Sequence, residues 1–207
     1  HNHLAPLGTT ASRPAYRTAG SLRVYRLAVA TTGEYVEAIG DVDGDLDIDK
    51  DDAIVEIINA INRVDQIYER DLGVRLVLIG QNTDIVYTNK FTDPYTDPYS
   101  NTDTCAINNT CASTADLLEQ NQTNINSVIG LDNYDIGHVF SRGGGGLAEV
   151  GSVCRDSVKA GGVTGLPNPT GDSFYIDFVA HEIGHQFSAE HSFNGTTSSC
   201  AAPNRWQ

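Results

Sequence analysis

Apolar and polar positions follow two different periods along the chain, and the change of period marks the predicted elements. Residues 22–31 (LRVYRLAVAT) form an apolar, β-branched run that predicts a buried strand, closed by Gly33. From residue 52 to residue 71, apolar residues recur three and four positions apart, which is the spacing of an amphipathic helix. Gly73 is placed to end that helix. The domain is therefore expected to begin with a strand and a helix that packs on its sheet.

The same alternation continues toward the C-terminus. The predicted elements are strands over 74–79, 85–88 and 135–141, a flexible glycine turn over 143–146 that leads into residues 147–154, and helices over 112–129 and 174–188. A Gly- and Pro-rich loop is expected before the last helix. Strands that alternate with helices favour an α/β fold with a mostly parallel sheet, in which the last helix carries the chemistry.

The last predicted helix contains a metal-binding pattern, because residues 179–191 read VAHEIGHQFSAEH. Residues four apart share one face of a helix, so His181 and His185 can reach the same zinc ion. Glu182 stands beside them and can hydrogen-bond the metal-bound water, take its proton and hand it to the leaving amine. The pattern predicts a catalytic zinc site with Glu182 as general base.

A catalytic zinc site has three protein ligands and one open position, so a third ligand is needed. The thermolysin-like choice, a glutamate well downstream, is closed because no Asp or Glu follows Glu190. His191 lies six residues after His185. The intervening QFSAE must end the helix and turn the chain back for His191 to reach the metal. We therefore expect His191 to be the third ligand.

The pattern HExxHxxxxxH resembles that of the metzincin zinc metallopeptidases, whose fuller motif is H-E-x-x-H-x-x-G-x-x-H followed by a methionine turn. Further segments are similar to the reprolysin (adamalysin-like) branch of the metzincins in its bacterial secreted form, and together they cover most of residues 22–191. These segments are LRVYRLAVATTGEY, INRVDQIYERDLGVRLVLI, GHVFSRGGGGLAEVGSVC and DFVAHEIGHQF. The resemblance implies a secreted endopeptidase that acts on proteins or peptides.

The resemblance also implies a fold and a substrate site. The expected fold is a twisted, mostly parallel five-stranded sheet, with an edge strand that borders the cleft and an active-site helix. The backbone of that edge strand would pair with an extended peptide substrate. Its residues would be Gly146, Leu147, Ala148, Glu149 and Val150. Family members are made with an inhibitory propeptide, so His1 would mark a maturation cut.

Two positions depart from the metzincin motif. Ser188 stands where the family has glycine, and a non-glycine residue in a turn with positive φ costs about 1 kcal/mol. The chain contains no methionine, so the methionine turn beneath the zinc cannot be formed by these residues. Either the natural polypeptide continues past Gln207, or the chain is a processed or nicked fragment. We expect the catalytic domain to be incomplete at this end, and activity to require further polypeptide.

Length, composition and charge narrow the class of protein. A chain of 207 residues with 40% hydrophobic residues fits one globular domain. We expect residues 1–20 to be an N-terminal arm and residues 21–207 to be the catalytic domain of a monomer. No apolar run is long enough to span a bilayer. A net charge of -14 would repel a phosphate backbone, so nucleic acid is excluded as a partner.

The four cysteines indicate disulfides in an oxidising compartment, and therefore secretion. They show no CxxC spacing and no cluster with the histidines, which argues against a thiolate zinc site. The short polar loop between Cys105 and Cys111 makes a local bridge the simplest pairing. Cys154 and Cys200 could then pair with each other, or either could have a partner beyond Gln207.

An acidic loop over residues 41–52 (DVDGDLDIDKDD) is a second candidate metal site. Its aspartates occupy positions 1, 3, 5, 7, 9 and 12 of a twelve-residue window, as in an EF-hand calcium loop. These residues are Asp41, Asp43, Asp45, Asp47, Asp49 and Asp52. However, position 6 is Leu46 rather than glycine. The alternative is a solvated loop whose last carboxylates favour the positive end of the following helix.

Other readings of the chain remain open at this point. His138, in an apolar strand, is expected to be a hydrogen-bonded core residue rather than a ligand. The alternative function is a non-catalytic zinc or calcium module of a secreted adhesin or binding protein. Glu182 discriminates between the two, because a structural zinc site fills four protein ligands and needs no adjacent base. A third possibility is an enzyme captured as an inactive fragment.

Overall fold

Five strands form one sheet at the centre of the molecule. In this computed structural model the described residues are 21–96, 114–143 and 145–191. The strand order is β2-β1-β3-β5-β4. Neighbouring strands from β2 to β5 are parallel, and only β4 runs antiparallel, against β5. The strands are β1 (Arg23–Thr31), β2 (Val74–Leu78), β3 (Ile136–Ser141), β4 (Gly145–Ala148) and β5 (Gly162–Gly165).

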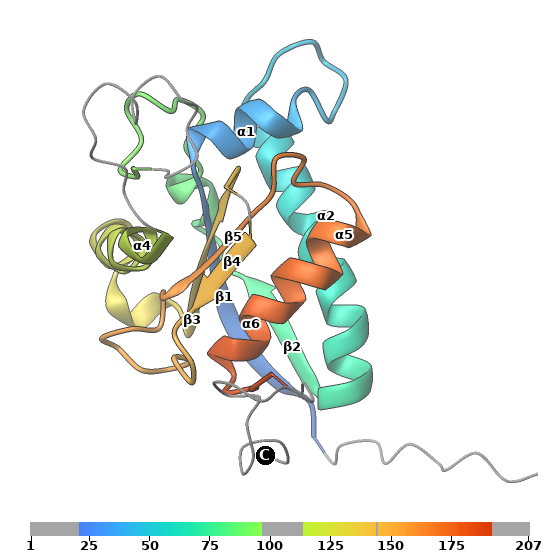
Figure 1. Ribbon diagram of the computed structural model, residues 1–207, viewed down its shortest axis with the longest axis vertical. Helices are drawn as coiled ribbons and strands as arrows, with labels where there is room; N and C mark the ends of the chain where they lie inside the picture. The colour runs from blue at the N-terminus through green and yellow to red at the C-terminus, as the bar shows by residue number, and fades with distance from the viewer. Residues whose placement is uncertain (1–20, 97–113, 144, 192–207) are drawn as a thin grey trace, which may run out of the picture.

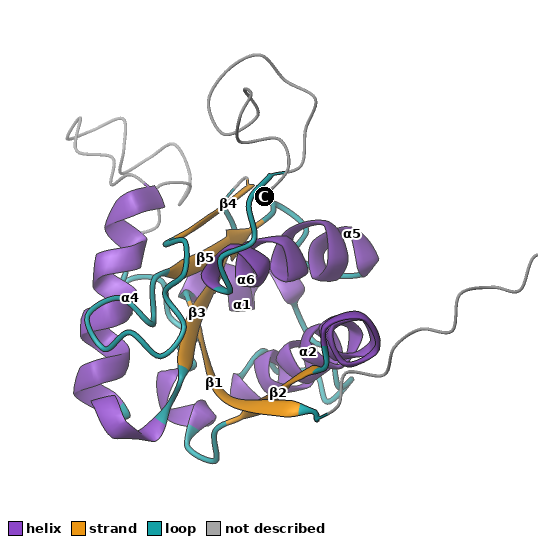
Figure 2. Ribbon diagram, turned by 90° about the horizontal axis from the view of Figure 1, so that it is seen from below, coloured by secondary structure: helices purple, strands orange, loops and turns teal. Residues whose placement is uncertain are grey.

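Helices cover both faces of this sheet (Figure 1; Figure 2). Helix α4 (Thr114–Val128) lies on one face. The other face carries α2 (Lys50–Leu72) and a last helical segment made of α5 (Asp172–Phe174), a π-helix η3 (Tyr175–Ala180) and α6 (His181–Gln186). The short helix α1 (Gly33–Ile39) follows β1, and two 3-10 turns are η1 (Asn82–Ile85) and η2 (Leu131–Asn133). None of the described helices is long and apolar enough to span a membrane.

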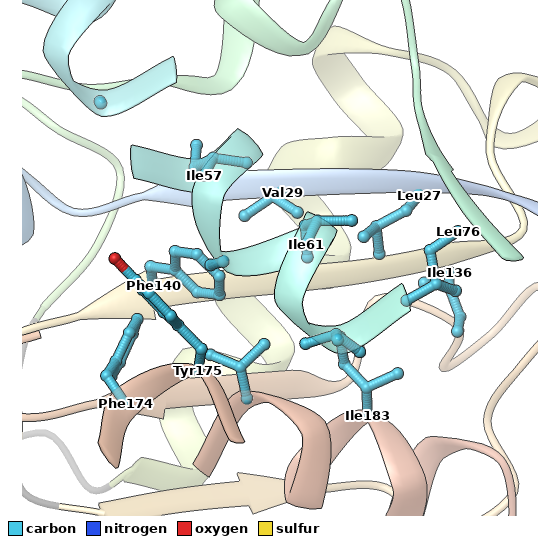
Figure 3. Close-up of a cluster of buried hydrophobic side chains, with 14 of the residues drawn as sticks. Leu27, Val29, Ile57, Ile61, Leu76, Ile136, Phe140, Phe174, Tyr175 and Ile183 are labelled. Carbon is cyan, nitrogen blue, oxygen red and sulfur yellow. The ribbon is translucent and has the colours of Figure 1, made fainter. Parts of the chain in front are cut away.

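The larger core lies between the sheet and the pair of helices that carries the predicted site. Ile57 and Ile61 of α2, Ile183 of α6 and the sheet residues Val29 and Phe140 belong to one buried cluster (Figure 3). All five side chains are at most 4% exposed. Burial of one such side chain contributes about 1.5–3 kcal/mol. This packing fixes the helix with the HExxH pattern against both α2 and the sheet.

The predicted fold is confirmed: the protein is an α/β domain with a mostly parallel, five-stranded sheet and an edge strand. The strands expected over 22–31, 74–79 and 135–141 are present as β1, β2 and β3, and the expected helices are present as α2, α4 and the last helical segment. The predicted edge strand is β4, although it ends at Ala148, so Glu149 and Val150 lie just beyond it.

Three local predictions were wrong. Residues 85–88 do not form a strand, because η1 occupies Asn82–Ile85 and only Val86 bridges to Thr31. The flexible glycine turn expected over 143–146 does not extend that far, because β4 begins at Gly145. The Gly- and Pro-rich loop before the last helix contains β5, which is buried and pairs with β3 and β4. Two glycines in its four residues hid this strand from a propensity argument, because glycine has no side chain to reveal a pleat.

The acidic loop is held together by its own backbone amides. Asp41 accepts hydrogen bonds from the amides of Gly44 and Leu46, at 2.6 and 3.1 Å. Asp49 is the N-cap of α2, and Asp52 accepts from the backbone of Asp49 in a reciprocal capping box. Carboxylate oxygens of three residues, Asp41, Asp43 and Asp45, come within 4.8 Å of one another. These contacts support the helix-cap alternative and do not support the calcium prediction.

Candidate metal centre

The helix with the HExxH pattern is anchored to α2 by three polar contacts along its length. Arg63 forms an ion pair with Asp172 at 2.7 Å, at the start of α5. The Tyr175 hydroxyl donates to the buried carboxylate of Glu56. The Tyr68 hydroxyl donates to the carbonyl of Ala180 at 2.6 Å, where the π-helix gives way to α6. This hydrogen bond ties α2 to the backbone immediately before His181.

The three predicted zinc ligands converge on one point. The Nε2 atoms of His181 and His185 lie 3.0 Å apart, and those of His181 and His191 are also 3.0 Å apart. The Nε2 atoms of His185 and His191 are 3.1 Å apart. Three imidazole nitrogens bound to a tetrahedral zinc ion stand about 3.3 Å apart, since each Zn–N bond is 2.0–2.1 Å long. The geometry of the donor set therefore fits zinc closely.

A neighbouring carbonyl fixes which nitrogen of His185 is free to bind a metal. His185 Nδ1 lies 2.6 Å from the carbonyl oxygen of Ala189, which can only accept a hydrogen bond. Nδ1 must therefore carry the proton, and neutral His185 presents a lone pair at Nε2. Burial, followed by the charges of His185 and His191, lowers the pKa of His181. This shift favours neutral His181, and a neutral imidazole is the form that coordinates zinc.

His191 reaches the site because α6 ends in a Schellman motif. The amide of Ala189 donates to the carbonyl of Gly184 at 2.9 Å, and the amide of Ser188 donates to the carbonyl of His185 at 2.8 Å. Between them, Ser188 adopts a left-handed conformation with φ 73°. Ser188 thus takes the conformation that the motif's glycine would take, as expected from the sequence. The motif reverses the chain within three residues and brings His191 beneath the helix.

Glu182 is buried directly against strand β4. Its side chain is only 6% exposed, and burial raises its pKa, with a partial opposing effect from His185. A Cβ atom added at Gly146 would lie 2.4 Å from Cγ and 2.5 Å from Oε1 of Glu182. The backbone of β4 therefore touches the Glu182 side chain. No sequence pattern predicts this contact, because the two residues are far apart in the chain.

The turn after β4 holds the end of the same helix. The amides of Gly151 and Val153 donate to the carbonyls of His185 and Gln186, at 3.0 and 3.3 Å. The turn also carries Cys154, which is exposed. The other cysteines, Cys105, Cys111 and Cys200, lie outside the described residues, as do the expected arm over 1–20 and the tail after His191, so both disulfide pairings stay predictions.

His138 is confirmed as a hydrogen-bonded core residue rather than a ligand. It is fully buried in β3 and contacts Gln186 and Thr164. Burial lowers its pKa from 6.5 to about 4, with a smaller opposing effect from the hydrogen bond to Gln186. Sequence reasoning missed its partners, because Gln186 was read only as a spacer between His185 and His191.

This buried imidazole gives a testable pH dependence of stability. Between pH 6.5 and pH 4 the unfolded chain binds a proton at His138 that the folded chain does not. The free energy of unfolding should therefore fall as the pH falls through this window, by about 1.4 kcal/mol per pH unit from this residue alone. Urea unfolding of the metal-free protein, compared with His138→Asn at each pH, isolates the contribution. Parallel curves for the two proteins would contradict the prediction.

The fold and the site together define a class of protein. An α/β domain whose last helix presents two histidines and a glutamate, followed by a chain reversal that adds a third histidine, has the architecture of a zinc metallopeptidase. Residues 54–192 match the family described as Metallo-peptidase family M12B Reprolysin-like. The match covers more than half of the chain, so the protein belongs to this family, whose members depend on zinc. A search of curated proteins found no match.

Proposed function

We propose that the protein is a zinc-dependent endopeptidase in which His181, His185 and His191 bind the metal and Glu182 is the general base. The convergence of three Nε2 atoms within 3.1 Å of one another carries this proposal. Membership of a metallopeptidase family supports peptide-bond hydrolysis as the reaction class and proteins or peptides as substrates. The alternative of a non-catalytic metal module receives no support from the site, because a buried carboxylate beside the three ligands serves no structural zinc.

The protein's own residues divide the work of hydrolysis. Zinc, when bound, supplies a Lewis acid that polarises the scissile carbonyl and makes water easier to deprotonate at neutral pH. Glu182 takes a proton from the attacking water as the water oxygen bonds to the carbonyl carbon. Glu182 then delivers that proton to the amide nitrogen as the C–N bond breaks. The contact with β4 holds the Glu182 carboxylate at one place on the cleft wall.

The substrate is proposed to bind along strand β4. β4 is an edge strand of the sheet, and an extended peptide can add to such an edge through main-chain hydrogen bonds. Gly146 places this edge against Glu182, while Leu147 and Val150 are 38% and 45% exposed. Ala148 and Glu149 complete the proposed contact segment. Secretion, an inhibitory propeptide, a monomeric state and the bacterial type remain predictions from the sequence.

Metal analysis and a cleavage assay test this proposal directly. We expect one zinc per chain by mass spectrometry of the native protein, and new peptide N-termini when a denatured protein is the substrate. Removal of the metal with a chelator should stop cleavage, and added zinc should restore it. Stoichiometric zinc without any cleavage would favour the non-catalytic alternative. A protein that holds no zinc would overturn the ligand assignment.

A further inference from the structure

A buried polar triad lies behind the metal-binding helix. It consists of His138 of β3, Thr164 of β5 and Gln186 of α6, which are all 0% exposed. His138 Nδ1 is 2.9 Å from Gln186 Oε1, and His138 Nε2 is 2.8 Å from Thr164 Oγ1. Gln186 Nε2 donates to the carbonyl of Gly137 at 3.0 Å. Each polar group of the triad therefore has a partner inside the protein.

The carbonyl of Gly137 determines the direction of every hydrogen bond in the triad. A carbonyl can only accept, so Gln186 must turn its amide nitrogen toward Gly137 and its oxygen toward His138. His138 must then donate from Nδ1, and Nε2 keeps a lone pair in the neutral imidazole that burial favours. The Thr164 hydroxyl fills that position as a donor. With His138 neutral, these contacts allow one proton arrangement of the triad.

The triad connects the metal-binding helix α6 with the strands that position β4 against Glu182. Gln186 directly follows the ligand His185 on α6. Thr164 pairs with Gly146 across the β4–β5 ladder, and Gly146 is the residue that touches Glu182. A closed path thus runs from the metal-binding helix through His138 to β5, across to β4, and back to the helix at Glu182.

The triad is packed too tightly to shift without loss of its hydrogen bonds. A Cβ atom added at Gly162 would lie 2.4 Å from His138 Nδ1 and 2.5 Å from Gln186 Oε1. The backbone of β5 therefore covers the His138–Gln186 hydrogen bond. A rotation of α6 about its axis would leave buried donors and acceptors unpaired, which costs about 1–3 kcal/mol for each group.

We propose that His138 is a positioning residue for the metal site, acting through Gln186 to fix the rotation of α6 relative to β3 and β5. The hydrogen bond places the nitrogens of His181 and His185 correctly with respect to His191 and the edge strand. This positioning role rests on the proposed function in one respect only, which is that zinc is the metal. A purely structural role for His138 predicts lower stability and an unchanged zinc site.

The test is zinc affinity, measured by competition with a chromophoric chelator at a temperature where every variant is folded by circular dichroism. His138→Leu should weaken zinc binding about tenfold or more, as expected when the support of metal ligands is lost. His138→Asn should bind within about threefold of the parent, because its side-chain amide can donate from near the position of Nδ1. Leu117→Ala is the matched control, since Leu117 belongs to α4 and is buried against the opposite face of the sheet.

Each outcome decides the proposal. The proposal is overturned if the His138→Leu variant folds and binds zinc within twofold of the parent. It is also overturned if Leu117→Ala loses as much zinc affinity as His138→Leu. If His138→Leu does not fold, Thr164→Val removes only the hydroxyl donor and should still weaken zinc binding severalfold, whereas unchanged affinity again overturns the proposal. Zinc affinity is measured without substrate, so a parent protein that binds zinc but cleaves nothing would refute the proposed function and leave this comparison valid.

Discussion

Replacement of Glu182 by glutamine is expected to lower kcat/KM for peptide hydrolysis about a thousandfold, within the range known for loss of a general base. Glutamine has almost the same shape, so the contact with β4 and the fold of α6 should be kept. It cannot accept a proton from water, and the proton-transfer path through this position is lost. Because Glu182 is not one of the three converging ligands, the zinc content should stay at one per chain.

The measurement is the steady-state rate on a quenched fluorescent peptide, together with metal analysis of the same sample. Glu119→Gln provides a matched control, because Glu119 is exposed on α4 and lies on the opposite face of the sheet. It should leave the rate unchanged. A Glu182→Gln variant with activity within tenfold of the parent would refute the assignment of Glu182 as the base.

Gly146→Ala should lower kcat/KM about a hundredfold with little change in stability. The added methyl group would lie 2.4–2.6 Å from Cγ, Oε1 and Cδ of Glu182, which is closer than atoms can approach. The Glu182 side chain is more easily displaced than the backbone of β4, so the side chain should move while the backbone stays. A displacement of about 1 Å in a reacting group can reduce the rate about a hundredfold.

A second glycine serves as the control for this substitution. Gly80→Ala places its methyl group in open space, with no atom within 4 Å. It should affect neither the rate nor the thermal midpoint. Gly146→Ala should match Gly80→Ala in thermal midpoint to within a few degrees and differ from it only in kcat/KM. Full activity of Gly146→Ala would show that β4 does not confine Glu182.

The convergence of the three histidines proposed as metal ligands could be predicted from the sequence, because it depends on local geometry. His181 and His185 share a helix face through the four-residue spacing alone. The chain reversal that brings in His191 was expected from the six-residue separation, and the left-handed Ser188 at its centre was expected from the departure at the motif's glycine. The Schellman bonds that build this reversal are all between residues within five positions of one another.

Elements with a strong hydrophobic periodicity were also predictable, while short segments with a weak periodicity were not. The apolar run of β1 and the helical spacing of α2 each contain enough side chains to reveal their period. Strand β5 has only four residues, and its extended conformation is set by pairing with β3 and β4 on its two sides. Residues 85–88 have the composition of a strand, yet only Val86 finds a partner there.

The sequence by itself determined the class of the fold and the family, and it singled out the three histidines and Glu182 for the proposed site, because each signal depends on spacing along a few turns of chain. Only the tertiary structure decided how these groups are held: Gly146 against Glu182, Tyr68 on the carbonyl of Ala180, and His138 on Gln186. These partners are separated by between 36 and 112 residues in the chain. No local propensity reports such contacts, because they form only when the sheet and its helices pack into one core.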